Sequence, residues 1–507
     1  MFFLCLEFLT QNKYADRILT AAAAERTSPA LQSGRTSGDY RVNIPEKFRQ
    51  KIIDMIGAEE YALYEMKLSG PCVHGLRANR LKIEKEKLSD LIKDCCALGE
   101  KVPWCDDGYY FDIDPAKMPG RSAYYLAGLY YIQEPSAMYP AANAMIKPGE
   151  KVLDLCAAPG GKSLRAASDL AGKGMLVSND ISASRAGTLL YNLELGGVPN
   201  AIVTNCTPGE LKKRFGEYFD VVLIDAPCSG EGMFRKDEEA LKSWEVFRND
   251  KCAAMQDGIL EEAAGLVRPG GRIVYSTCTF DVAENEGSVS RFLDSHPGFA
   301  LRELPKTGGV SDGFATTAHP DLSGTARLWP HRLKGEGQFA AMMVKERGGG
   351  EAAGAVRARS PRSFRILGRI PEEYVRFAAD NFNYLPYEDC FFYMMGSNLF
   401  ICPFEPADID GLKTLRMGVH AGEISYNRFR PAQHFIMSLD RGAFRRKVDL
   451  DPDGAEIRGY LRGESVACDS AGNGFNAVCV GGYQIGSGEM RDGIMKNYYP
   501  KGWRRII

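Results

Sequence analysis

Two cysteines stand directly after buried-strand patterns, Cys228 in the segment DAPC and Cys278 in the segment YSTC. A carboxylate, Asp225, opens the first of these segments. The strands predicted at residues 220–227 and 272–278 are rich in Val and Ile, as strands buried in a parallel sheet are. Neighbouring strands of such a sheet direct their carboxyl ends toward one crevice. We therefore expect two thiols and a carboxylate to meet at one edge of a sheet.

A thiol beside a carboxylate suits covalent catalysis on a pyrimidine base. Carbon 5 of cytosine is a poor nucleophile, but a thiolate that adds to carbon 6 makes carbon 5 enamine-like and able to take a methyl group from a sulfonium. A carboxyl group that protonates or hydrogen-bonds N3 favours the addition, and a base must then remove the carbon-5 proton so that the thiol can leave. The residues alone do not decide which of the two thiols attacks.

The other twelve of the 14 cysteines are interpreted as structural, because free cysteine is among the most buried residue types and usually only packs. No CxxC pair occurs and the six histidines are dispersed, so neither a structural zinc site nor a redox pair is expected. We predict free thiols in a reducing, cytoplasmic environment.

A glycine-rich segment, residues 154–163 (DLCAAPGGKS), lies between a predicted strand and a predicted helix. It differs from a phosphate-binding P-loop, because Cys156 replaces the first glycine and Pro159 lacks an N–H. A tight glycine turn at the end of the first strand is still a ligand position in a doubly wound sheet, and Asp180, at the end of the next strand, is placed to accept from a ribose hydroxyl. Each feature alone is an ordinary connection. Together they favour a cofactor that contains adenosine.

The elements around these residues alternate between strands and helices, which predicts an α/β fold with a parallel, doubly wound sheet. The expected strands are residues 151–156, 174–180, 201–205, 220–227, 272–278 and 338–345, and the clearest helix is 249–267. With 507 residues, 45% of them apolar and 25% charged, the chain is not mostly disordered or fibrous. The net charge of −2 excludes a polycation, so a nucleic-acid partner must be held by local basic patches.

The chain divides into five predicted regions. They are a weakly structured extension (1–40), an N-terminal α/β unit (41–125), the doubly wound domain (126–346), a Gly/Ala/Arg-rich linker (347–364) and a β-rich, locally basic region (365–507). The opening segment MFFLCLEFL has no charged n-region, so we interpret it as an amphipathic start or a misassigned start codon and not as a signal peptide. No uncharged run of ~18 residues predicts a membrane span.

These motifs resemble those of the Sun/Fmu-type RNA (cytosine-5)-methyltransferases. The segments that carry the resemblance are 131–138 (YIQEPSAM), 154–162 (DLCAAPGGK), 225–228 (DAPC), 275–278 (YSTC) and 327–344 (RLWPHRLKGEGQFAAMMV). The tail segments LRMG, RFRPAQH, YLRGE and KNYYPKGWR are similar to the C-terminal domain of bacterial members that modify small-subunit ribosomal RNA. The resemblance covers about residues 41–507.

The resemblance implies a class I methyltransferase sheet with its last strand antiparallel, an N-terminal RNA-binding unit, a PUA-like C-terminal region and the cofactor S-adenosylmethionine. It further implies that Cys278 is the nucleophile, that Cys228 assists product release, and that Asp225 lies at both the cofactor and N3 of the target base. The residues implied to bind the cofactor are Cys156, Ala157, Ala158, Pro159, Gly160, Gly161, Lys162, Asp180 (on the ribose), Arg185, Thr207 and Asp225.

Two points stay open. Where the family usually carries an Asp near the adenine amino group, this chain has Thr207. We therefore expect either a lower cofactor affinity than an Asp would give or a contact to the adenine from Asn205. DNA cytosine-5 methyltransferases use the cysteine of a Pro-Cys pair, which here would make Cys228 the nucleophile.

The predicted function is methylation of carbon 5 of cytosine in RNA, with 16S rRNA or the small ribosomal subunit as partner. The alternatives are a tRNA cytosine-5 methyltransferase, a catalytically silent ribosome-assembly factor, and an amino-methyltransferase, whose usual [DN]PP[YF] turn is absent. We expect a monomer, without a metal or a membrane partner. Tyr498, Tyr499 and Trp503, among basic residues, suit base stacking and backbone contact, or alternatively belong to a core.

Overall fold

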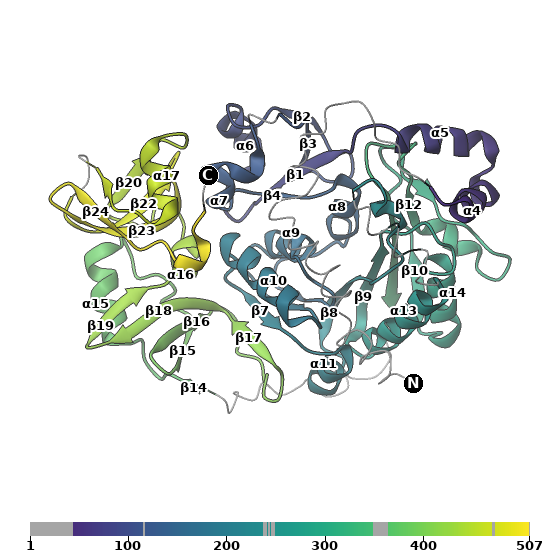
Figure 1. The fold of residues 1–507 in the computed structure, drawn as a ribbon. Helices are drawn as coiled ribbons and strands as arrows, with labels where there is room; N and C mark the ends of the chain where they lie inside the picture. The colour runs from purple at the N-terminus through teal and green to yellow at the C-terminus, as the bar shows by residue number, and fades with distance from the viewer. Residues whose placement is uncertain are drawn as a thin grey trace.

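A computed structural model describes residues 44–114, 117–236, 241, 244, 249–347, 364–468 and 472–505. An N-terminal unit and a C-terminal part, which contains two small sheets, both lie against a central α/β body (Figure 1). The predicted extension (1–40) and residues 348–363 of the predicted linker lie outside the described residues. Within the described ranges, no helix has the length and apolar character needed to cross a membrane.

The central body is built on a ten-stranded sheet of order β11-β12-β13-β9-β8-β5-β6-β7-β17, with β10 paired to β13. Its strands are β5 (Lys151–Asp154), β6 (Met175–Asn179), β7 (Ala201–Thr204), β8 (Phe219–Asp225), β9 (Val267–Thr277), β10 (Phe299–Arg302), β11 (Ser311–Asp312), β12 (Ala326–Leu328), β13 (Gln338–Lys345) and β17 (Thr414–Met417). Strands β5 to β9 pair in parallel, and β13 is antiparallel to β9. The predicted doubly wound α/β fold, with its late strand antiparallel, is confirmed.

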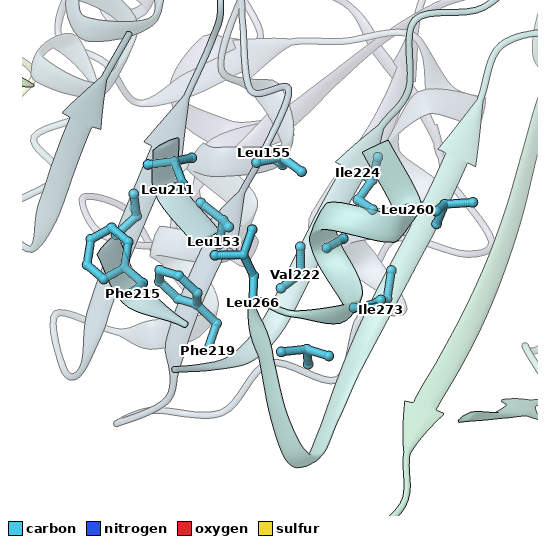
Figure 2. Packing of buried hydrophobic residues seen from close by; sticks show 14 of the residues in the cluster. Leu153, Leu155, Leu211, Phe215, Phe219, Val222, Ile224, Leu260, Leu266 and Ile273 are labelled. Carbon is cyan, nitrogen blue, oxygen red and sulfur yellow. The ribbon is translucent and has the colours of Figure 1, made fainter. Parts of the chain in front are cut away.

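Helices cover both faces of this sheet. One face carries α8 (Pro135–Ala142), α9 (Gly161–Leu170) and α10 (Ala183–Leu195), and the other carries α11 (Pro208–Phe215), α13 (Asn249–Ala264) and α14 (Glu286–Ser295). Successive strand residues point to opposite faces. Thus Val222 and Ile224 pack with the α11 and α13 side in Figure 2, whereas Val221 and Leu223 belong to the other core. Burial of each such side chain contributes about 1.5–3 kcal/mol.

The pairing of β8 with β9 decides where the site lies. Asp225, the last residue of β8, is in register with Ser276 of β9. The loops that follow the two strands therefore start side by side, at the carboxyl edge of the sheet. The first loop contains a single 3₁₀ turn, η3 (Glu231–Met233).

The N-terminal unit consists of a helix pair and a small antiparallel sheet of order β2-β3-β1-β4. Its elements are α4 (Glu46–Ile56), α5 (Ala58–Leu68), β1 (His74–Ala78), α6 (Lys85–Ile92), β2 (Leu98–Lys101), β3 (Gly108–Phe111), η2 (Pro119–Arg121), α7 (Ala123–Leu126) and β4 (Tyr130–Ile132). The helix pair lies apart from this sheet, beside the central body (Figure 1). There Phe48 and Tyr64 pack against Phe234, Phe280 and Trp329 of the central body.

The C-terminal part holds two five-stranded sheets, of order β14-β15-β16-β18-β19 and β20-β22-β23-β24-β21. Its elements are β14 (Arg365–Ile366), α15 (Glu372–Asn381), β15 (Phe391–Met395), β16 (Asn398–Cys402), β18 (Val419–Ser425), β19 (Arg428–Pro431), α16 (Gln433–Ser438), β20 (Lys447–Leu450), α17 (Ala455–Arg462), β21 (Val466–Ala467), β22 (Gly474–Val480), β23 (Tyr483–Arg491), β24 (Ile494–Asn497) and η5 (Lys501–Trp503). Strand β17 leaves this part and pairs with β7, so it extends the central sheet. The prediction of a β-rich C-terminal region is confirmed.

Candidate active site

The two thiols singled out in the sequence face each other across the edge of the sheet. The Sγ atoms of Cys228 and Cys278 are 3.4 Å apart, within hydrogen-bonding distance for sulfur, and both residues are partly exposed. The hydrogen bond to Cys278, together with burial, raises the pKa of the Cys228 thiol well above its usual range. Cys228 therefore stays protonated and can donate its S–H to Cys278.

The predicted carboxylate, Asp225, makes an ion pair with the lysine of the glycine loop. Lys162 Nζ lies 2.7 Å from Asp225 Oδ2, and Ser276 Oγ donates to Asp225 Oδ1 at 3.0 Å. The lysine side chain is only 8% exposed, whereas that of Asp225 is 40% exposed. The pair joins the glycine loop to the edge that carries the thiols and leaves the carboxylate open to a ligand.

The glycine loop turns sharply into helix α9. Gly160, at the N-cap of this helix, has φ +117°, which L side chains rarely adopt. A Cβ on Gly161 would lie 2.9 Å from the Gln133 side chain, so this position requires close approach. Arg77 of β1 donates to Gly161 O at 2.7 Å and to Gln133 Oε1 at 3.0 Å. Through Arg77, the N-terminal sheet thus contacts and stabilises the end of the glycine loop.

Asp180 and Arg185 both contact the residue at the centre of this loop. Asp180 Oδ2 accepts from Ala158 N at 3.3 Å, and Arg185 Nη2 donates to Ala158 O at 2.7 Å. Asp180 Oδ1 accepts from Ser182 N at 2.9 Å. Burial raises the pKa of Asp180, and this effect exceeds the opposing effect of Arg185. The structure therefore brings these two predicted residues together against the loop.

Thr207, which was predicted to lie near the adenine, caps a helix. It is the N-cap of α11 and forms a capping box with Glu210, in which Glu210 N donates to Thr207 Oγ1 at 3.3 Å and Thr207 N donates to Glu210 Oε2 at 2.7 Å. The Thr207 hydroxyl also donates to Glu210 Oε2. The Asn205 amide nitrogen donates to the carbonyls of Asp180 and Ile181. An adenine contact from either residue stays a prediction.

The donor and acceptor groups of this loop fit a nucleoside cofactor. Each carboxylate oxygen of Asp180 accepts one backbone N–H, and such an oxygen can accept a second donor, such as a ribose hydroxyl. Asp154 Oδ1 is buried and has no hydrogen-bond partner among the described residues, while Ser163 Oγ donates to Asp154 Oδ2 at 2.7 Å. Burial raises the pKa of Asp154 to about 7. Because Asp154 is fully buried, it lies beneath the loop and is out of contact with solvent.

Replacing Asp154 by asparagine is expected to remove a pH-dependent destabilisation. The carboxyl group titrates near 3.8 in the unfolded chain and near 7 in the folded one, so wild-type stability falls as the pH rises between these values. Between about pH 5.5 and pH 8.5 the free energy of unfolding of the variant should gain about 2 kcal/mol relative to wild type. Thermal melts at both pH values test this. Asp90→Asn, at an exposed position on α6, serves as control. A stability difference between Asp154→Asn and wild type that is the same at both pH values would contradict the prediction.

The aromatic residues of the tail have different surroundings. Tyr499 and Trp503 are buried, 2% and 8% exposed, in a core that they share with Tyr460. Their rings are therefore not available to stack on a base, and the core interpretation holds for both. Tyr498 is partly buried, and its hydroxyl donates to Glu489 at 2.6 Å.

Several polar residues around the thiols were not found from the sequence. Lys51 of α4 contacts Glu231 and Asp281, one residue from each thiol loop, and Glu284 accepts from the backbone of Ser229. Glu284 follows Cys278 by only six residues, which is the one local signal that could have identified it. Lys51 is remote in sequence and gives no such signal.

Four family models match successive parts of this chain. The family model described as 16S rRNA methyltransferase RsmB/F matches residues 143–344, and the N-terminal domain of 16S rRNA methyltransferase RsmF matches 44–135. The RsmF first C-terminal domain matches 376–439, and the RsmF PUA domain matches 447–505. Two models thus divide the β-rich region, and the PUA model covers its second part.

Among similar proteins is ribosomal RNA small subunit methyltransferase F of Shewanella sp. (strain MR-4), 31% identical over 85% of this chain and 91% of the relative. The protein of the same name from Vibrio vulnificus (strain YJ016) is 30% identical over 91% of this chain and 97% of the relative. A solved structure, a methyltransferase homologue from Pyrococcus horikoshii, is 29% identical over 60% of this chain and 96% of that one, with a TM-score of 0.52. With similarity over almost the whole chain and matching models for all its units, the protein belongs to the RsmB/F family of 16S rRNA methyltransferases.

Proposed function

We propose that this methyltransferase transfers a methyl group from S-adenosylmethionine to carbon 5 of a cytosine in small-subunit ribosomal RNA, with Cys278 as nucleophile. The observation that carries the proposal is the pair of thiols 3.4 Å apart at the sheet edge, next to the Asp225–Lys162 ion pair. An enzyme that methylates an exocyclic amine needs no thiol. A thiol pair beside a carboxylate fits the addition and elimination that carbon 5 requires.

The glycine loop and its neighbours are proposed to hold the cofactor. The cofactor supplies the methyl group as a sulfonium. Residues Cys156, Ala157, Ala158, Pro159, Gly160 and Gly161 form the loop, Lys162 joins it to Asp225, and Asp180 has acceptor capacity left for the ribose. Arg185 fixes the loop carbonyl of Ala158. Thr207 stays a proposed adenine contact only if its hydroxyl leaves Glu210.

The two thiols are proposed to act in turn on the base. Cys228 is held as a neutral thiol, and its S–H lies next to Cys278 Sγ, 3.4 Å away. Attack by Cys278 Sγ on carbon 6 forms a covalent bond, and carbon 5 then gains the methyl group. Removal of the carbon-5 proton restores the double bond and expels Cys278. The carbon-5 proton goes to a base, Cys278 leaves as a thiolate, and the neighbouring Cys228 S–H can assist by donating a hydrogen bond to this leaving thiolate.

Asp225 and Lys162 are proposed to bind the polar edge of the cytosine. An ionised carboxylate only accepts hydrogen bonds, whereas N3 also accepts. The proton for N3 therefore comes either from Asp225 in its acid form or from the Lys162 ammonium group, which lies 2.7 Å from Asp225 Oδ2.

The N-terminal unit and the C-terminal region are proposed to bind RNA around this site, because a cytosine in structured RNA must leave its stack to reach a thiol. Arg428 and Arg430 of β19 are exposed, and Tyr426, in the turn before them, is 98% exposed. Basic side chains beside an open ring suit backbone contact and base stacking. The boundaries 41–125, 126–346 and 365–507 stay predictions, as do a monomeric state and a cytoplasmic location.

The proposal is tested by bisulfite mapping of RNA from a strain that lacks the gene. We expect one or more 5-methylcytosines to disappear from the small-subunit ribosomal RNA, and to return with the wild-type gene but not with Cys278→Ala. Loss of a site in transfer RNA alone would favour the tRNA alternative. An unchanged map would favour a silent assembly factor.

A further inference from the structure

The two loops that carry the thiols are tied to each other by reciprocal hydrogen bonds. Gly232 N donates to Cys278 O at 2.8 Å, and Phe280 N donates to Glu231 Oε2 at 3.0 Å. Ser229 N, in the same loop as Gly232, donates to Glu284 Oε2 at 3.0 Å. Each loop thus offers an acidic side chain to a backbone N–H of the other.

A buried glutamine and two hydroxyls complete this connection. Gln256 Nε2 of α13 donates to Pro227 O and to Glu284 Oε2, both at 2.9 Å, so it holds the carbonyl just before Cys228. Ser229 and Thr279 share a hydrogen bond of 2.7 Å between their hydroxyls. The backbone on both sides of Cys228 is therefore fixed to the loop that follows Cys278.

The N-terminal helix pair adds a cation to the two loops. Lys51 Nζ of α4 lies 2.6 Å from Glu231 Oε1 and 2.5 Å from Asp281 Oδ2, so one ammonium group contacts a carboxylate from each loop. The side chains of Glu231 and Asp281 are 0% and 11% exposed, and that of Lys51 is 21% exposed. Burial lowers the pKa of Lys51, but the two carboxylates outweigh it and the net shift is upward.

Both carboxylates also accept hydrogen bonds from groups other than Lys51. Glu231 also accepts from Trp244 Nε1 at 2.8 Å, in addition to Phe280 N. Asp281 Oδ1 accepts from Ala283 N at 2.7 Å. Removing the shared cation takes away an attraction that holds Glu231 and Asp281 close together, and the fully buried Glu231 has little access to water in its place. Their separation would move the loops and, with them, the thiols.

Apolar packing holds the helix that carries Lys51 in place. Phe48, one turn before Lys51, lies with its ring centroid 5.0 Å from that of Phe234, and Tyr64 of α5 lies 5.7 Å from Phe280. Phe234 directly follows η3 in the loop after Cys228, and Phe280 lies two residues after Cys278. The helix pair therefore contacts the catalytic loops through an aromatic cluster as well as through Lys51.

We propose that Lys51 is a positioning residue, through which the N-terminal helix pair holds Cys228 and Cys278 at reaction distance. The proposal rests on the function proposed above only for its effect on methylation. The distance between the thiols is a property of the protein that can be measured without RNA. On this basis the catalytic domain alone has an incomplete site, because the cation that joins its two thiol loops comes from another unit.

The test uses the full chain and compares Lys51→Met with Lys47→Met, an exposed lysine one turn earlier on the same helix. We expect Lys51→Met to lower kcat for total ribosomal RNA from the deletion strain by about 10- to 100-fold, the range for a displaced catalytic group, with the KM for S-adenosylmethionine unchanged. Lys51→Arg should recover most of the rate, and Lys47→Met should match wild type.

A second measurement reports on the thiols themselves. Phenylarsine oxide bridges two neighbouring thiols with loss of water, and mass spectrometry of the peptides that contain Cys228 and Cys278 measures the bridged fraction. This fraction should fall in Lys51→Met and remain at the wild-type level in Lys47→Met. Because it needs no RNA, a fall in bridging in a chain that methylates nothing would support the positioning role and refute the proposed function.

A milder variant keeps the proposal testable if Lys51→Met does not fold. Asp281→Asn retains the shape of the side chain and an acceptor for Ala283 N, but removes one of the two ion pairs. It should give smaller losses of kcat and of bridging in the same direction. The proposal is overturned if folded Lys51→Met and Asp281→Asn both keep kcat and the bridged fraction within about twofold of Lys47→Met. A twofold change is well below the loss expected for a displaced catalytic group.

Discussion

Replacing Cys278 by alanine is expected to lower methyl transfer to RNA by about three orders of magnitude or more, the scale seen when a covalent nucleophile is removed. The physical reason is that without a bond to carbon 6, carbon 5 of cytosine stays a poor nucleophile toward the sulfonium. The cofactor should still bind, because the glycine loop follows β5, Asp180 follows β6, and neither bonds to Cys278 in the part of the chain that the structure describes. Transfer of a tritiated methyl group measures the first effect and calorimetry the second.

The matched control is Cys390→Ala, a partly exposed thiol beside β15 in the C-terminal part. It should transfer methyl groups at the wild-type rate, which separates a specific loss from a general effect of removing a thiol. Substantial residual turnover in Cys278→Ala would contradict the assignment and point to Cys228. If Cys278→Ala loses both cofactor binding and turnover, Cys278 instead supports the fold of the site.

The sequence predicts the strands and the loops of the central sheet well, because each is a local pattern. Runs of Val, Ile and Leu mark β5, β8 and β9, and small or polar residues follow each run. Once parallel pairing is assumed, the carboxyl ends must share one edge, so the convergence of the two thiols follows. The pairing of β8 with β9 and the 3.4 Å separation of Cys228 and Cys278 agree with this argument.

Contacts between residues far apart in the chain could not be predicted in this way. Strand β17 extends the central sheet beside β7, where Thr414 pairs with Thr204, 210 positions earlier in the chain (414 − 204). Lys51 reaches Glu231 and Asp281 across 180 and 230 residues. A lysine on an amphipathic helix is normally solvated, and nothing in the sequence around it indicates a buried partner.

Thr207 shows the opposite case, in which a local rule was available and points to a structural use. The segment TPGE places a glutamate three residues after a threonine with proline between them, which is a capping-box pattern at the start of a helix. The resemblance to a family that carries an Asp here suggested a cofactor contact instead. The structure shows the capping box with Glu210, so helix capping accounts for the hydroxyl without any ligand.

The second large effect is expected for Cys228→Ala, which should methylate its RNA once and then remain bonded to it. Addition by Cys278 and methyl transfer do not need the second thiol, whereas elimination does if Cys228 assists it. The substitution leaves the loop in place, because the bonds from Gln256 to Pro227 O and from Ser229 N to Glu284 involve the backbone around Cys228 and not its side chain. A loss of turnover would therefore report on chemistry.

Denaturing gels measure this result directly. Cys228→Ala should give a protein band shifted by the mass of the RNA, dependent on S-adenosylmethionine and absent in Cys228→Ala/Cys278→Ala. If the single variant gives neither an adduct nor a methylated product, Cys228 is the nucleophile and the two roles are reversed. If it turns over normally, Cys228 only packs against Cys278 at 3.4 Å, and Cys278 leaves carbon 6 without its help. The adduct distinguishes these three cases because only the first leaves carbon 6 bonded to a thiol after the methyl group has been transferred.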